Sequence, residues 1–158
     1  MNDYTITKTE GICLVILSGA PVGLPFVEAV FTALSKRDLN IDMISQSPPT
    51  GIVADLAFTV SDNDLAEVLA VIACLRGDYP QIKSTVSNGN VKLNVSGERM
   101  RHSVGVAARV FCALEQINPQ ITLVTTSETD ISLLIQGADA DTAYEALLTA
   151  LQKASFLK

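Results

Sequence analysis

The pattern of apolar and polar positions along this chain occurs twice, in the same order. In each copy, a β-branched apolar run ends at Ser-Gly, and a loop leads into apolar residues at helical spacing. Two further apolar runs and a second helical stretch follow. We therefore expect strand, helix, strand, strand and helix in each copy. Matched residues lie 80 positions apart: Phe31 and Phe111, Leu34 and Leu114, Ile41 and Ile121, and Ser47 and Ser127.

The spacing between the copies changes only at predicted loops. It is 78 residues between Gly19 and Gly97, and 75 residues between Asp55 and Asp130. Loops tolerate changes of length better than the elements they connect. Insertions confined to loops therefore indicate a duplicated folding unit.

In the first copy, residues 12–19 predict a buried strand, and residues 26–34 predict an amphipathic helix. Residues 39–47 and 52–60 predict a hairpin, because the Pro-Pro-Thr-Gly segment between them forms a turn. A second helix should begin with Ser61 as its N-cap and end at residues 77–80. The two apolar stripes are Phe26, Val27, Val30, Phe31 and Leu34, and Leu65, Val68, Leu69, Ile72 and Leu75.

The second copy predicts strands at residues 91–97, 121–127 and 130–137, and a last helix from about Asp139. Residues 82–87 can supply a fourth strand to the first copy, whereas no such segment follows the second. We expect the N-terminal strand, residues 3–8, to complete the second sheet, with residues 88–90 forming only a turn. The helical stripes of this copy are Val106, Val110, Phe111 and Leu114, and Tyr144, Leu147, Leu148 and Leu151.

The resulting fold class is α+β, with two ferredoxin-like βαββαβ units. Each unit has a four-stranded antiparallel sheet with two helices on one face. The expected domains are residues 11–88 and residues 89–158, with strand 3–8 joining the second.

Composition narrows the class of partner. The chain has 158 residues, 48% of them hydrophobic, a net charge of -6 and a pI near 4.6. An acidic surface argues against binding to nucleic acid or to an anionic membrane, which need basic faces. No apolar run approaches the roughly 20 residues that span a bilayer, and the polar N-terminus is not a signal peptide. We expect a cytoplasmic protein whose partners are small molecules or proteins.

Residue types with strong chemistry are sparse. The only histidine, His102, has no carboxylate or cysteine at ligand spacing and is expected on a surface loop, so no metal site is predicted. Cys13, Cys74 and Cys112 are embedded in apolar stretches and are expected to pack in the core. Phosphate-binding loops and nucleophile elbows are absent from the sequence. No catalytic residue is therefore predicted, and a ligand-binding or assembly module is expected.

Four segments carry a resemblance to a known family: 40–47, 55–60, 97–111 and 125–135. Together they resemble the C-terminal regulatory region of aspartate kinases, a tandem pair of ACT domains, over about residues 5 to 154. The family's kinase domain, which uses ATP and Mg to phosphorylate the aspartate side chain, is absent here. The chain thus resembles either a regulatory fragment of a longer chain or the separately translated β subunit of some bacterial aspartate kinases.

The resemblance implies feedback control by lysine or threonine, without another cofactor in this chain. In the family, the effector binds where the ACT units of two chains pair, and it shifts the attached kinase between two states. The implied partners are a second copy of this chain and an aspartate kinase catalytic domain or subunit. The implied effector-binding residues are Pro21, Val22, Gly23, Leu24, Pro25, Asn40, Ile41, Asp42 and Gln46, facing Gln120, Ile121, Ser127 and Glu128.

The first-copy loop departs from the family pattern, and the second-copy loop stays closer to it. Val22, Leu24 and Pro25 replace the usual Asp, Pro and Gly, and a valine cannot bind an ammonium group. A dimerisation module with a degenerate effector site is therefore the alternative function. The second-copy loop comprises Met100, Arg101, His102, Ser103 and Gly105, with Val104 in place of Pro.

Several of these residues have a structural interpretation beside the functional one. Asn40 and Asp42 either contact a ligand or cap the helix end and begin the strand. Met43 is expected to pack rather than bind. Ser127 and Glu128 either contact the effector or simply form the tight turn between two strands.

Overall fold

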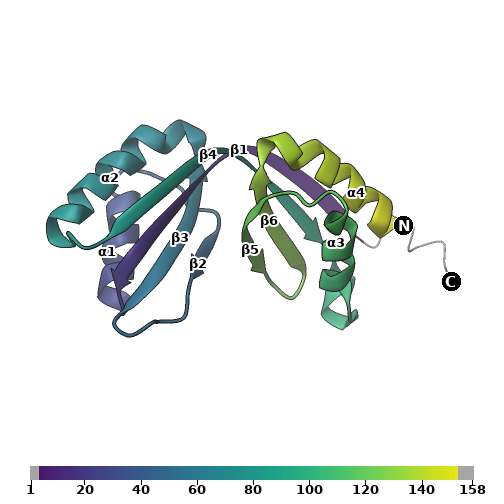
Figure 1. Ribbon diagram of the computed structural model, residues 1–158, viewed down its shortest axis with the longest axis horizontal. Coiled ribbons are helices and arrows are strands. Elements are labelled where there is room, and N and C mark those ends of the chain that lie inside the picture. The colour runs from purple at the N-terminus through teal and green to yellow at the C-terminus, as the bar shows by residue number, and fades with distance from the viewer. Residues whose placement is uncertain (1–3, 153–158) are drawn as a thin grey trace. The chain divides into compact units, whose positions relative to one another are not determined.

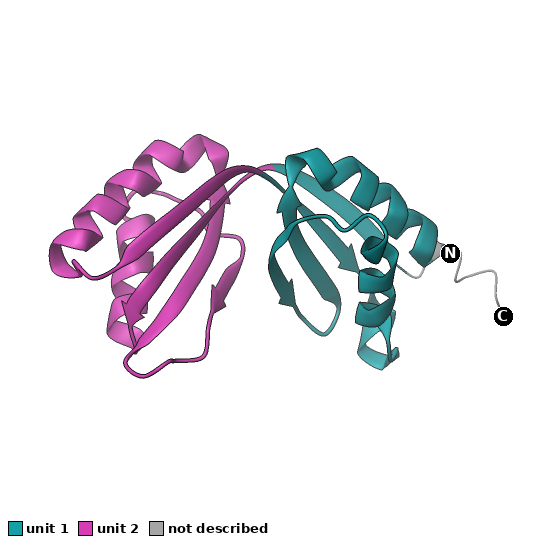
Figure 2. Ribbon diagram, viewed as in Figure 1, with its two compact units in different colours: residues 1–10, 90–158 teal, residues 11–89 magenta. Residues whose placement is uncertain are grey.

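The computed structural model describes residues 4–152, which fold into two compact units (Figures 1 and 2). Unit 2 comprises residues 11–89 and holds the first copy. Unit 1 comprises residues 90 onward together with residues up to Glu10, and holds the second copy. Residue 3 of the predicted first strand, and residues 153–158, lie outside the described part of the chain.

The elements follow the predicted order. The strands are β1 (Thr5–Pro21), β2 (Ile44–Gln46), β3 (Val53–Ser61), β4 (Lys83–Ser96), β5 (Ile121–Thr126) and β6 (Asp130–Gln136). The helices are α1 (Leu24–Ser35), α2 (Leu65–Asp78), α3 (Val106–Glu115) and α4 (Ala140–Gln152). Three short 3-10 helices are η1 (Asp62–Asp64), η2 (Glu98–His102) and η3 (Gly137–Asp139).

The strand order confirms the predicted fold class. Neighbouring strands follow the order β2-β3-β1-β4-β6-β5, so that unit 2 uses the order β2-β3-β1-β4 and unit 1 the order β1-β4-β6-β5. The β1–β3, β2–β3, β4–β6 and β5–β6 pairs are antiparallel. With two helices in each unit (Figure 2), this is the ferredoxin-like α+β arrangement.

Strands β1 and β4 are longer than predicted, and each passes from one unit to the other (Figure 1). Residues 5–8 and 12–19 are strand, as the sequence predicts, but they belong to one strand rather than two. The turn predicted at residues 88–90 is wrong, because these residues lie within β4. Gly11 and Gly89 lie inside the strands with φ of 70° and 71°. Glycine accepts this left-handed conformation without a Cβ penalty, so the chain can bend there without ending the strand.

Unit 2 is built around apolar side chains from β1, β3 and both helices. Of the strand predicted over residues 39–47, only Ile44–Gln46 forms a strand, β2. Asp42 nevertheless donates its backbone amide to the Thr59 carbonyl of β3 at 3.2 Å. Met43 is buried, as predicted. Its large buried side chains include Leu17, Phe26, Leu34, Leu56 and Phe58.

Unit 1 has a core of the same kind. Strands β4 and β6 and helices α3 and α4 contribute to it. None of the helices in the described part of the chain is long and apolar enough to cross a membrane. Its most deeply buried large side chains are Leu93, Leu133, Ile135 and Leu147.

Four residues predicted to be buried are exposed. Leu69 and Phe111 each directly follow a buried valine on their helix, so they project about 100° away from the buried row. Cys74 and Cys112 are also exposed, so core packing holds for Cys13 alone. A helix with a narrow buried stripe leaves such flanking positions in solvent.

Candidate functional site

The second-copy loop and the turn between β5 and β6 line a cavity of about 270 Å³ in unit 1, which is open to solvent. Apolar and polar groups both line it, as is usual for small-molecule sites. Five of the predicted residues lie together here: Met100, Ser103, Gly105, Ser127 and Glu128. The remaining lining residues are Val106, Ala107, Thr126 and Ile131.

The loop reaches this position through a short 3-10 helix and a left-handed glycine. Met100 donates its amide to the Gly97 carbonyl at 3.0 Å, and this closes the turn of η2. Gly105 then adopts φ 87° as the N-cap of α3, where no side chain caps the helix. The first backbone amides of α3 therefore have no capping acceptor from the N-cap side chain, and helix starts of this kind favour anionic groups.

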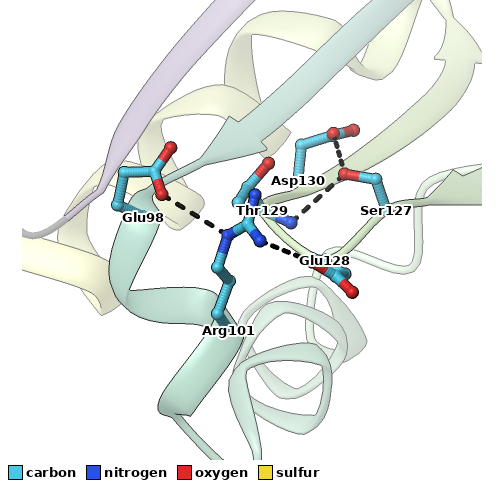
Figure 3. A network of polar contacts seen from close by, with 6 residues as sticks. All are labelled: Glu98, Arg101, Ser127, Glu128, Thr129 and Asp130. Carbon is cyan, nitrogen blue, oxygen red and sulfur yellow. Dashed lines mark hydrogen bonds and ion pairs between the residues drawn. The ribbon is translucent and has the colours of Figure 1, made fainter.

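The opposite wall is a tight turn held by its own side chains (Figure 3). Ser127 donates its amide to the Asp130 carbonyl at 2.9 Å, and its hydroxyl donates to the Asp130 carboxylate. The Thr129 amide donates to the Ser127 hydroxyl at 3.2 Å. Ser127 and Glu128 thus form the β5–β6 turn.

An ion pair connects the loop to this turn. Nη1 of Arg101 lies 2.7 Å from Oε2 of Glu128, while Nε of Arg101 lies 3.5 Å from Oε2 of Glu98 (Figure 3). Arg101, Glu128 and Ser127 line a second hollow, together with Met100 and His102. His102 is exposed there, as predicted. The described residues include no cluster of three metal-ligating side chains.

The first-copy loop is mostly apolar at its surface. Val22 is 45% exposed and Leu24 is 80% exposed, while Pro25, in the first turn of α1, removes one backbone amide there. Val22 donates its amide to the Ile52 carbonyl at 3.1 Å, which brings the loop against the β2–β3 turn. Pro21 ends β1, and Gly23, with φ 126°, is the N-cap of α1.

The other predicted effector residues divide between the two units. Asn40, Asp42 and Gln46 are exposed in unit 2, and Ile41 is half-buried. In unit 1, the backbone amide of Gln120 donates to a carboxylate oxygen of Asp139 at 3.2 Å. Ile121 begins β5 and pairs with Ile135.

Sequence reasoning missed four residues that line the cavity: Val106, Ala107, Thr126 and Ile131. Each lies within three positions of a residue in the matched loop or in the matched Ser-Glu turn. Adjacency to those motifs was the signal that could have identified them. The sequence also gives no sign that Arg101 pairs with Glu128, which is 27 residues away.

Comparison with known proteins gives consistent matches. Residues 93–151 match the ACT domain family. The aspartokinase of Geobacillus stearothermophilus is 34% identical over 142 residues, which cover 90% of this chain and 34% of that protein. The chain spans about a third of the length of the curated relatives it matches.

Solved structures resemble the chain over nearly its whole length. The ligand-free regulatory subunit of aspartate kinase from Thermus thermophilus has a TM-score of 0.83 and 25% identity, covering 92% of this chain and 95% of that one. Aspartokinase III from E. coli, in complex with lysine and aspartate, has a TM-score of 0.68 and 20% identity, covering 92% of this chain and 32% of that one. At this identity, the second likeness shows the fold alone.

Proposed function

This chain is an ACT-type regulatory region of the kind found in aspartate kinases, and on that basis we propose that it binds an amino-acid effector and mediates feedback inhibition. The proposed effector is an end product of the aspartate family, lysine or threonine. The aspartokinase III complex with lysine supports testing that amino acid first. A cytoplasmic location belongs to the same proposal.

The observation that carries the proposal is the cavity of unit 1. One wall is the uncapped start of α3, which offers amide donors to a carboxylate. The other wall is the Ser127–Glu128 turn, which offers acceptors to an ammonium group. Val106 and Ile131 add an apolar surface for the carbon chain of the ligand. These three features together suit an α-amino acid.

A second effector site is proposed to form only when two chains pair. It would combine the loop Pro21–Pro25, Asn40–Asp42 and Gln46 of one chain with Gln120, Ile121, Ser127 and Glu128 of another. This arrangement requires a homodimer, and regulation requires an aspartate kinase catalytic domain or subunit. Effector binding would then shift the kinase between two states of different affinity for the effector.

Calorimetric titration of the full chain tests the binding step. Lysine, threonine and methionine are each added to millimolar concentration, and a saturable heat is expected with lysine or threonine. The melting temperature should rise with the same ligand, because a ligand that binds the native state stabilises it. Absence of heat with all three amino acids would refute the proposal.

A dimerisation module with a degenerate effector site is the second candidate, and the first-copy loop favours it. Val22 and Leu24 are exposed there, and Pro25 lacks an amide, so this loop provides few groups for a polar ligand. Light scattering should then show a dimer without added ligand. A rise in melting temperature with lysine or threonine would count against a degenerate site.

A further inference from the structure

We propose that Arg101 and Glu128 determine specificity for a zwitterionic ligand by exchanging their mutual ion pair for two ion pairs with that ligand. Arg101 would bind the carboxylate of an α-amino acid, and Glu128 its ammonium group. This inference rests on the proposed function, since the hollow that Arg101 lines shares Met100, Ser127 and Glu128 with the cavity at the start of α3.

The two side chains are placed for this exchange. Their charged atoms lie 2.7 Å apart, and both line the hollow beside Ser127 and Met100. Glu128 also lines the neighbouring cavity at the start of α3. The ammonium and carboxylate of an α-amino acid are attached to one carbon atom, so they are about as close together as the two side-chain groups. A bound amino acid can therefore satisfy both residues at once.

Each residue is also held in place by contacts other than the ion pair. Nε of Arg101 lies 3.5 Å from Glu98, so this contact remains when Nη1 turns from Glu128 to a ligand. Glu128 belongs to a turn whose geometry is fixed by Ser127, Thr129 and Asp130. Neither side chain needs a rearrangement of the backbone to change partner.

The exchange is favourable because the existing pair is exposed. Arg101 is 49% exposed and Glu128 is 75% exposed. Ion pairs in water contribute little to stability, because both charges are well solvated when they separate. A ligand that supplies both charges replaces the pair without leaving either charge unmatched. A ligand with only one charge makes one ion pair where the zwitterion makes two, and this difference is the source of discrimination.

The first copy provides an internal comparison. The position 80 residues before Glu128 is Pro48, and the loop from Pro21 to Pro25 carries no charged residue. Unit 2 therefore lacks both members of the pair, although its strands and helices follow the same order. Zwitterion recognition by this pair is confined to unit 1.

The test uses the full chain and isothermal titration with L-lysine and L-threonine. Each amino acid is compared with its carboxamide, which lacks the carboxylate, and with its Nα-acetyl derivative, which lacks the α-ammonium. We expect Arg101→Gln and Glu128→Gln each to weaken amino-acid binding by about tenfold or more, because each removes a charge-assisted hydrogen bond. Arg101→Gln should change the affinity for the carboxamide by less than threefold. Glu128→Gln should likewise change the affinity for the acetyl derivative by less than threefold.

Matched controls separate this effect from a change in net charge. Arg99→Gln, in the same 3-10 helix, and Glu115→Gln, at the end of α3, should leave affinity within about twofold. If the analogues bind too weakly to measure, Arg101→Lys must recover most of the affinity that Arg101→Gln loses. If both glutamine variants bind the amino acid as tightly as the wild type does, this inference is overturned and the proposed function stands. A wild-type chain that binds neither amino acid overturns the proposed function as well.

Discussion

The ammonium group of Lys8, on the first part of β1, lies 2.7 Å from a carboxylate oxygen of Asp141 in the first turn of α4. Glu10 lies 2.9 Å from the same ammonium group. Hydrogen bonds to Asp141 and then to Glu10 raise the pKa of Lys8 above its usual range. The contact joins the beginning and the end of unit 1.

This contact predicts a specific dependence of stability on pH. A lysine whose pKa is raised by folding stabilises the protein fully below the pKa of an unfolded lysine, about 10.4, and loses this contribution as the pH rises through the folded value. We expect Lys8→Met to be less stable than wild type by the same small amount at pH 7 and pH 9. Urea denaturation should show that difference shrinking at pH 11; a difference that grows there would contradict the assignment.

Two leucines on one helix test the assignment of the core of unit 2. Leu75 is 6% exposed and Leu69 is 48% exposed, and both lie on α2. Leu75→Ala should lower the unfolding free energy by about 2–4 kcal/mol, because it removes buried methyl groups and leaves a cavity. Leu69→Ala should cost less than about 1 kcal/mol. Equal losses in urea denaturation would contradict the packing described for α2.

Two glycines should respond in opposite directions to the same substitution. Gly105 has φ 87° and open space around it, so Gly105→Ala is strained by its backbone alone. This substitution should lower the free energy of unfolding by about 1–2 kcal/mol. Gly77 lies in α2 with no atom close to an added Cβ. Gly77→Ala should therefore raise the free energy of unfolding by up to about 1 kcal/mol. Thermal melting measures both. A stabilised Gly105→Ala would show that α3 does not begin at a left-handed residue.

The first-copy loop can be tested by restoring a charge. Val22→Asp places a carboxylate where the family pattern has one, and we expect binding of lysine at that loop to tighten by about tenfold. Ile52→Asp is the control, because Ile52 is 85% exposed and its carbonyl accepts the hydrogen bond of the Val22 amide. Calorimetry should show a stronger or additional binding event for Val22→Asp only. The same gain in both variants would indicate a general effect of charge.

The three thiols should differ in reactivity. Cys74 and Cys112 are exposed and should react with Ellman's reagent in the native protein. Burial, and to a lesser extent the Asp62 carboxylate, raises the pKa of the Cys13 thiol, which lowers its thiolate fraction. Two thiols should therefore titrate quickly and the third only after denaturation. Three rapid reactions in the native protein would show that Cys13 is accessible.

The order of the elements could be predicted from the sequence because it depends on local patterns. Ser61 is one example: its hydroxyl accepts the Asn63 backbone amide at 3.3 Å, as a serine before a helix predicts. It caps η1, which leads directly into α2, whereas the N-cap of α2 itself is Asp64. The packing of Met43 is another. Both depend on a few neighbouring residues.

The continuity of β1 and β4 could not be predicted in this way. Gly11, Gly89 and Asn90 are residues typical of turns, and a local pattern cannot show that pairing with partner strands continues past them. The same limit applies to the site. The sequence identified both the loop and the Ser-Glu turn, but the Arg101–Glu128 pair depends on β6 lying beside β4.

The passage of β1 from one unit to the other determines how this duplication can be divided. Unit 2 is continuous in sequence, whereas unit 1 takes its last strand from the N-terminus and is in effect a circular permutant of unit 2. A gene fragment that begins at Asn90 would lack an edge strand. To express unit 1 alone, the segment around residues 4–10 would have to be moved, through a linker, to a position after α4.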